Sequence, residues 1–195
     1  MSAGRPRSFD VEKALDRALK VFWRKGYEGA SLPELTKAMS INRPSLYAAF
    51  GNKEALFRKA LDRYAEGPAA YMGEAMAEPT GRAVVEKLLR GAVDLLSDPR
   101  NPRGCLAVQG ALACGEAADS IRKELASRRL AREAALCKRL KQAKSDGDLS
   151  ADANPADLAR YIATVMQGMA VQAAGGATRR ELTKVAETAM RAWPK

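Results

Sequence analysis

The sequence predicts an all-α fold with an N-terminal three-helix domain and a larger C-terminal helical domain. Residues that favour helices are abundant along the 195-residue chain, and residues that favour strands are sparse. Apolar residues recur three and four positions apart, and caps, glycines and prolines divide the chain into about nine helical segments. The composition is 47% hydrophobic and 29% charged, which is typical of a globular chain with a hydrophobic core.

The first predicted helix begins after Asp10, a capping residue, and ends at Gly26. Its apolar face consists of Val11, Ala14, Leu15, Ala18, Leu19 and Phe22. Ser31 and Glu34 have the spacing of a capping box, so a second, short helix is expected to begin there and to end near Met39.

The third predicted helix runs from about Arg43 to Phe50, with Pro44 in its first turn. Gly51 ends this helix, and Asn52 then caps a fourth one.

A Gly-Pro pair at residues 67 and 68 predicts an interruption or a bend in the fourth helix. We therefore place a boundary near residue 65, between domains 1–64 and 65–195. Five further helices are expected over about residues 84–96, 105–118, 120–144, 155–175 and 178–194.

Basic residues are concentrated near the N-terminus. Residues 1–64 contain 13 Lys and Arg against 7 Asp and Glu, which is +6 of the total formal charge of +10. Such an excess favours a polyanionic partner, most often nucleic acid. The alternative is a basic surface without a nucleic-acid partner, and the charge alone does not distinguish these two interpretations.

The chain lacks the residues and motifs that several classes of enzyme and metal-binding protein use. It has no histidine, which is the commonest general base and metal ligand, and it has no nucleophile motif or phosphate-binding loop. Cys105, Cys114 and Cys137 match neither a CxxC pair nor a zinc site, which favours reduced thiols in a cytoplasmic protein. No secretory signal or membrane-spanning stretch is apparent. We expect no enzyme, no catalytic residue, no metal site, no cofactor and no membrane partner.

Three short helices within about 50 residues, with a tight connection between the second and third, are typical of a helix-turn-helix, whose second helix enters the DNA major groove. The outer face of the third helix is small and polar. Arg43 can reach a guanine or a phosphate, and Ala48 permits close approach to a thymine methyl. The hydroxyls of Ser45 and Tyr47 can bind phosphates, and Lys53 adds charge at the next helix start.

Residues 5–64 resemble the DNA-binding domain of the TetR family of transcriptional regulators, most clearly in "FWRKGYEGASL" and "SLYAAFGNKEALF". The sequence departs from the family at Ser40, where Gly is usual in the turn and another residue is tolerated at some strain. The resemblance implies DNA contacts by Ser31, Arg43, Pro44, Ser45, Tyr47, Ala48, Lys53 and a basic arm with Arg5 and Arg7. Arg43 and Ala48 match positions that read bases, and Phe50 is expected in the core.

For residues 65–195 the resemblance implies a ligand-binding and dimerisation domain, whose last two long helices pair with those of a second copy. The small and apolar residues available for that surface are Ala159, Ile162, Ala163, Met166, Gly168, Met169, Ala170, Ala173, Leu182, Val185, Ala186 and Ala189. The alternative is that these residues form the internal core. The candidate ligand-binding residues are Leu88, Cys105, Gln109, Tyr161 and Met166.

The segment "RGCLAVQGALACGEA" resembles a Gly-Cys-Leu segment from one branch of the family. Cys105 opens a predicted helix, and both the helix N-terminus and the nearby Arg103 lower the pKa of a thiol. A redox or electrophile sensor is one interpretation, and a packed small residue is the other, because free cysteines are commonly buried.

Together these observations predict a ligand-responsive regulator, in the repressor class, that binds a palindromic double-stranded DNA operator as a homodimer and is released by a small-molecule effector. A regulator that senses thiol chemistry through Cys105 is the alternative. An enzyme and an architectural DNA-binding protein without a ligand are two others. The absence of catalytic motifs argues against the former, and the size of the second domain argues against the latter.

Overall fold

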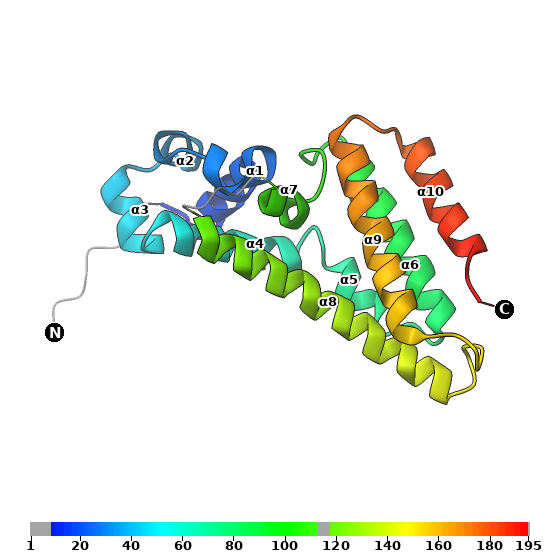
Figure 1. Ribbon diagram of the computed structural model, residues 1–195. Helices are drawn as coiled ribbons and strands as arrows, with labels where there is room; N and C mark the ends of the chain where they lie inside the picture. The colour runs from blue at the N-terminus through cyan, green and yellow to red at the C-terminus, as the bar shows by residue number, and fades with distance from the viewer. Residues whose placement is uncertain (1–8, 113–117, 195) are drawn as a thin grey trace, which may run out of the picture.

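The computed structural model describes residues 9–112 and 118–194, which form ten helices and no strand (Figure 1). The all-α prediction is confirmed. The helices are α1 (Val11–Gly29), α2 (Leu32–Met39), α3 (Arg43–Phe50), α4 (Lys53–Glu66), α5 (Tyr71–Ala75), α6 (Gly81–Ser97), α7 (Leu106–Leu112), α8 (Asp119–Ser145), α9 (Pro155–Ala174) and α10 (Arg179–Arg191). Helices α1 to α4 lie at one end of the molecule, α6, α9 and α10 at the other, and α8 extends from α4 to α9.

Local capping residues set the start of the helices at the N-terminal end. Asp10 accepts hydrogen bonds from two backbone N–H groups in the first turn of α1. Ser31 and Glu34 form the expected capping box at α2. Asn42 and Asn52 each accept a backbone N–H at 2.8 Å, at the starts of α3 and α4. Each cap satisfies a backbone donor that the helix itself leaves unpaired.

Two residues with positive φ shape the helix-turn-helix. Gly26 has φ 69° and ψ −176°, so it kinks α1 where we expected the helix to end, and one further turn reaches Gly29. Ser40 has φ 57° and ψ 42°, the left-handed conformation required by the tight turn after α2. Its Oγ accepts a hydrogen bond from Arg17 of α1 at 2.9 Å, which anchors the turn despite its unfavourable backbone.

The segment that follows α4 contains one helix more than the sequence predicted. As expected, α4 stops before Gly67-Pro68. The short helix α5 follows and was not predicted, because a helix of five residues is too short to show an apolar period. The helix expected over 105–118 is present as α7 up to Leu112, and residues 113–117 with Cys114 lie outside the described residues.

One continuous hydrophobic core joins both ends of the molecule. Aromatic rings fill its N-terminal part, where Phe22 packs edge-on against Phe57 with ring centroids 4.9 Å apart. Trp23 packs in the same way against Tyr64 at 4.7 Å. Such edge-to-face pairs contribute about 0.5–1.5 kcal/mol beyond the area that they bury.

Most of the residues considered for a dimer surface belong to this core instead. The buried ones are Ala159, Ile162, Met169, Ala170, Ala173, Leu182, Ala186 and Ala189. Only Gly168 and Val185 of that set are exposed. The core interpretation therefore holds for most of the set, because α9 and α10 turn their apolar faces toward α6 and toward each other.

No helix in the described part of the chain is both long and apolar enough to cross a membrane. Within residues 9–112 and 118–194, no three Asp, Glu, Cys or His side chains lie close enough together to hold a metal ion.

Candidate DNA interface and candidate effector cavity

Helix α3 turns one face to the core and the other to solvent. Leu46 and Phe50 are buried, so the expectation that Phe50 points inward is met. Arg43, Pro44 and Ala48 are exposed on the opposite face. Tyr47 is 47% exposed on the same face, so its ring and hydroxyl are accessible to a partner.

Lys53 is half-buried at the first turn of α4, beside this exposed face. Its Nζ lies 4.6 Å from the ring centroid of Tyr27, a cation-π contact that fixes the position of the ammonium group. Burial lowers the pKa of Lys53 from its usual value, and the charge of Glu28 opposes that shift. The lysine is thus held at a helix N-terminus, where free N–H groups already favour an anion.

Two other residues that are predicted to contact DNA have side chains or backbone groups that are already hydrogen-bonded or partly buried. The Ser31 hydroxyl is exposed, but it donates to Glu34 Oε2 at 3.1 Å and accepts from the Glu34 backbone N–H. Ser45 is half-buried, and its backbone N–H is capped by Asn42. Arg5 and Arg7 lie outside the described residues.

A cavity of about 390 Å³ lies between α5, α6, α7, α8 and α9, next to the C-terminal end of α4. Its walls are mostly apolar. They consist of Ala65, Ala69, Tyr71, Met72, Gly73, Met76, Leu88, Ala92, Leu95, Leu96, Cys105, Ala107, Val108, Arg129, Arg132, Glu133, Ala135, Leu136, Ala163, Met166, Gln167 and Ala170. The volume lies in the range of small-molecule sites, which are apolar with a few polar groups.

Three of the five residues predicted to contact a ligand line this cavity, namely Leu88, Cys105 and Met166. Tyr161 and Gln109 do not. Tyr161 is 40% exposed on the outer side of α9. The side-chain amide of Gln109 donates to the Arg103 carbonyl at 3.0 Å, and its Oε1 is buried without a hydrogen-bond partner in the described structure.

Sequence reasoning missed the aromatic and charged part of the wall. Tyr71, Met72 and Met76 come from α5 and the turn after it, an element that was not predicted. Arg129 and Arg132 come from α8, a helix with many charged residues, and neither arginine was among the predicted ligand contacts. The only available signal was the pair of methionines beside Tyr71, since Met is common in the walls of adaptable pockets.

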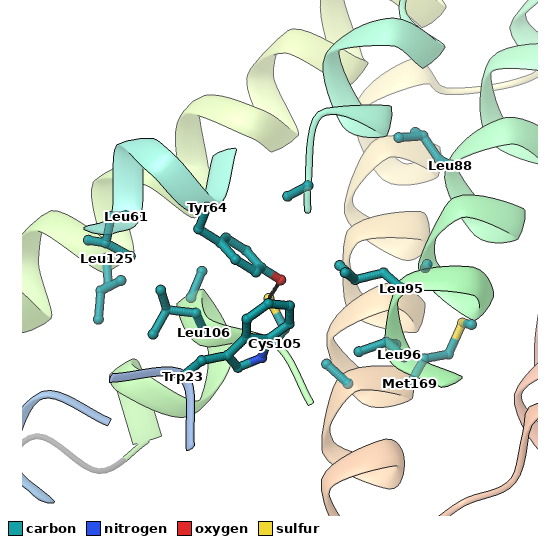
Figure 2. Close-up of a cluster of buried hydrophobic side chains, with 14 of the residues drawn as sticks. Trp23, Leu61, Tyr64, Leu88, Leu95, Leu96, Cys105, Leu106, Leu125 and Met169 are labelled. Atoms are coloured by element: carbon teal, nitrogen blue, oxygen red, sulfur yellow. Dashed lines mark hydrogen bonds between the residues drawn. The ribbon is translucent and has the colours of Figure 1, made fainter. Parts of the chain in front are cut away.

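The segment Gly104–Cys105 contacts both the cavity and the helix-turn-helix, since Cys105 lines the cavity. Figure 2 shows Cys105 beside Tyr64 and Trp23. The indole Nε1 of Trp23 in α1 donates to the Gly104 carbonyl at 2.8 Å. The hydroxyl of Tyr64 in α4 donates to Cys105 Sγ at 3.3 Å. Burial raises the pKa of Tyr64 well above its usual value, so the hydroxyl remains a donor.

Salt bridges between α4 and α8 add a second connection between the two ends. Arg58 of α4 contacts Glu124 at 2.5 Å, and Arg128 of α8 contacts Asp62 at 2.7 Å. Helices α7 and α8 therefore join α4 in holding the helix-turn-helix against the rest of the molecule.

Comparisons with known proteins agree with this architecture. Residues 14–60 match the family described as bacterial regulatory proteins, tetR family, and residues 81–191 match a tetracyclin repressor-like C-terminal domain. The chain is 33% identical over 196 residues to the HTH-type transcriptional repressor ComR of Escherichia coli K12, a match that covers 100% of this chain and 93% of ComR. The chain belongs to the TetR family. It is a helix-turn-helix, DNA-binding transcriptional regulator rather than an enzyme.

Solved TetR-family structures also resemble this chain, at more than 40% sequence identity in the following two cases. A cysteine mutant of the TetR family regulator CifR, complexed with 26-base-pair double-strand operator DNA, is 44% identical. It superimposes with a TM-score of 0.93 and covers 98% of this chain and 100% of its own. A putative TetR regulator from Rhodococcus sp. RHA1 is 42% identical, with a TM-score of 0.64, and covers 93% and 98% of the two chains.

Proposed function

We propose that this TetR-family protein is a repressor that binds a palindromic operator as a homodimer and leaves it when a small-molecule effector enters the cavity. The observation that carries the proposal is the buried Gly104–Cys105 segment, which touches the helix-turn-helix on one side and the cavity wall on the other. Two relatives support the same conclusion: ComR is described as a transcriptional repressor, and the CifR structure is a complex with operator DNA.

In this proposal the exposed face of α3 enters the major groove. The base-reading residues are Arg43 and Ala48. The DNA backbone is contacted by Ser31, Pro44, Ser45, Tyr47 and Lys53, with Arg5 and Arg7 as a basic arm. Residues 1–64 form the DNA-binding domain, and residues 65–195 form the effector-binding and dimerisation domain.

The outer faces of α9 and α10 supply the dimer surface. Tyr161, Val171 and Val185 are large or branched apolar residues that are 40%, 48% and 41% exposed. Gly168 lies between the first two on α9, and a Cβ built there would have no neighbour within 4 Å. Residues 161, 168 and 171 lie on one helix face, so a second copy could approach α9 closely over the glycine.

Effector release follows from the shared segment. A ligand that binds better to an arrangement in which Gly104–Cys105 is displaced would shift the populations toward that arrangement. Trp23 and Tyr64 would then carry the displacement into α1 and α4, and the two recognition helices of the dimer would lose the spacing of adjacent major grooves. A coupling of about 1–3 kcal/mol corresponds to a 5- to 150-fold loss of DNA affinity.

Selection of binding sites from a random DNA library, followed by footprinting, tests the DNA-binding part. We expect a symmetric site with half-sites one helical turn apart, about 34 Å, or a multiple of that distance. Arg43→Ala and Ala48→Leu should change the preferred bases. Tyr47→Phe and Lys53→Ala should weaken all sites similarly, with a lower salt dependence for Lys53→Ala.

Two results would overturn these assignments. Protection of a single asymmetric half-site by a monomer would exclude the dimer. An unchanged preferred sequence in both Arg43→Ala and Ala48→Leu would show that the bases are read elsewhere on the protein.

A second candidate is a thiol-sensing regulator, because Cys105 lines the cavity and is only 7% exposed. A Michael acceptor inside the cavity could add to Cys105. The C–S bond would form as the π bond of the acceptor's C=C breaks, the thiol proton would pass to water, and the acceptor's α-carbon would take up a proton from water. N-ethylmaleimide treatment should then abolish DNA binding in the wild type and leave Cys105→Ser active. Equal loss in both proteins would exclude this candidate, since one of the other two cysteines, Cys114 or Cys137, would then account for the effect.

A further inference from the structure

The cavity is apolar over most of its surface, which defines the body of its ligand. Met72, Met76, Leu88, Leu95, Leu96 and Met166 contribute to the walls. A small inorganic ion would leave these side chains without contacts, so the complex would gain little dispersion energy from them. The occupant therefore has a hydrocarbon or aromatic portion.

One charged group in the wall has no partner. Arg132 projects from α8 into the cavity lining and is half-buried. Within the described residues it makes no salt bridge and no hydrogen bond. A half-buried guanidinium without a partner is costly, because its five N–H donors lose water and gain no acceptor.

The neighbouring charged side chains on α8, by contrast, already have a hydrogen-bond or salt-bridge partner. Arg129 donates to the Ala107 carbonyl at 3.3 Å. Glu133 forms a salt bridge of 3.0 Å with Arg160, whose side chain is largely exposed. The net charge left on this wall is consequently positive. The neutral Ala107 carbonyl leaves the charge of Arg129 uncompensated, and Arg132 has neither a counter-ion nor an acceptor within the described residues.

A phenol lies beside this guanidinium. Tyr71 of α5 lines the same cavity, and its hydroxyl has no hydrogen-bond partner within the described chain. Burial raises the pKa of Tyr71 far above its usual value although the charge of Arg132 acts in the opposite direction, so the hydroxyl stays protonated and can donate. Gly91 of α6 fixes the ring, since a Cβ built there would lie 2.2 Å from Tyr71 Cδ2.

We infer that the effector is an amphipathic monocarboxylate, whose carboxylate binds Arg132 and the Tyr71 hydroxyl and whose apolar body fills the rest of the cavity. This inference rests on the proposed function. A carboxylate is ionised at neutral pH, and its two oxygens match the planar fork of a guanidinium. Its position beside Cys105 would bring the negative charge to the segment that holds Trp23 and Tyr64.

The test compares ligands that differ only in charge. The probes are decanoate and naphthalene-2-carboxylate, each paired with its uncharged methyl ester, and calorimetry on the full-length protein gives each dissociation constant. Decanoate is used below the concentration at which it forms micelles. We expect at least one acid to bind about tenfold or more tightly than its ester, as for a charge-assisted hydrogen bond.

Three variants assign that preference to its residues. Arg132→Gln should reduce the preference for the acid to less than about threefold, while Arg132→Lys should retain part of it. Tyr71→Phe should weaken the acid more than the ester. Arg122→Gln is the matched control, because Arg122 lies on the same helix, is exposed and pairs only with Asp119.

The inference is wrong if neither acid binds more tightly than its ester, or if Arg132→Gln keeps the full preference while its unfolding temperature without ligand is that of the wild type. DNA binding is measured separately. An acid that binds through Arg132 without releasing DNA would confirm the site and contradict the proposed release. Absence of any sequence-specific DNA binding would contradict the proposed function and leave the assignment of the carboxylate site standing.

Discussion

Replacing Trp23 with Phe isolates the contact between the helix-turn-helix and the Gly104–Cys105 segment. The indole of Trp23 is 1% exposed, and its N–H reaches the Gly104 carbonyl, 81 residues further along the chain. Phenylalanine keeps an aromatic ring near Tyr64, whose ring centroid lies 4.7 Å from that of Trp23. The substitution therefore removes the hydrogen bond and only part of the packing.

The expected loss is the sum of two contributions. Gly104 is buried, so its carbonyl would lose its partner without gaining water, at a cost of about 1–3 kcal/mol. The smaller ring leaves a void that adds about 1 kcal/mol. The free energy of unfolding should fall by about 2–4 kcal/mol, a large share of the 5–15 kcal/mol typical of a domain.

Urea unfolding followed by circular dichroism measures this loss, and Trp193→Phe provides a matched control. Trp193 is 9% exposed, and its indole N–H makes no hydrogen bond within the described residues. The chain has two tryptophans, so each variant keeps one and its fluorescence follows one end of the molecule. We expect Trp193→Phe to lose less than half as much stability as Trp23→Phe.

A second measurement tests the role of the same contact in release. With an effector acid in the cavity, Trp23→Phe should show a smaller change in DNA affinity than the wild type, and Trp193→Phe should show the full change. If Trp23→Phe and Trp193→Phe destabilise the protein equally, the hydrogen bond contributes nothing to folding. If Trp23→Phe keeps the full effector response, the route from the cavity to DNA does not pass through Gly104.

Three other substitutions have defined outcomes. Ser40→Gly and Ser40→Ala both remove the hydrogen bond from Arg17, but only glycine relieves the left-handed backbone. Ser40→Gly should therefore be more stable than Ser40→Ala by about 1 kcal/mol in thermal unfolding. Gly91→Ala should destabilise by about 1–3 kcal/mol and weaken acid binding, because its Cβ displaces Tyr71; unaltered calorimetry would contradict this. The pKa of Asp98, lowered to about 2 by Arg100, implies stability that is full above pH 3.8 and lost as the pH falls through 2. Asp98→Asn should flatten the acid limb of a stability-against-pH curve over that window.

Local signals in the sequence accounted for the helix starts. Asp10, Ser31, Asn42 and Asn52 act within one turn of their own positions, so a short window of sequence is enough to identify them. The exposed face of α3 followed from the same kind of reasoning, because a short helix with two buried residues has its remaining side chains outside. Helix α5 was not predicted because its packing against α6, rather than an apolar pattern in its own sequence, stabilises it.

The cavity was harder to predict, because helix packing decides which face of a long helix is inside. Tyr161 and Met166 lie on the same helix five residues apart, yet one is exposed and the other lines the cavity. Arg132 is one of many charged residues on α8, and nothing in the sequence distinguishes it from Arg128, which has two carboxylate partners. Only the positions of α5 and α7 show that Arg132 lines the cavity without a hydrogen bond or salt bridge in the described structure.

Backbone geometry explains why Gly104 can serve both ends of the molecule. Its φ of 82° is unfavourable for any other residue, and a Cβ there would lie 2.4 Å from Gln109 Nε2. This conformation turns the Gly104 carbonyl toward Trp23 while the next residue, Cys105, reaches the cavity wall and the Tyr64 hydroxyl. A shift of a few tenths of an ångström in this segment therefore changes contacts in α1 and α4 together. In the proposed release mechanism, α1 and α4 carry this displacement to α3, so an effector in the cavity would alter DNA binding without touching α3.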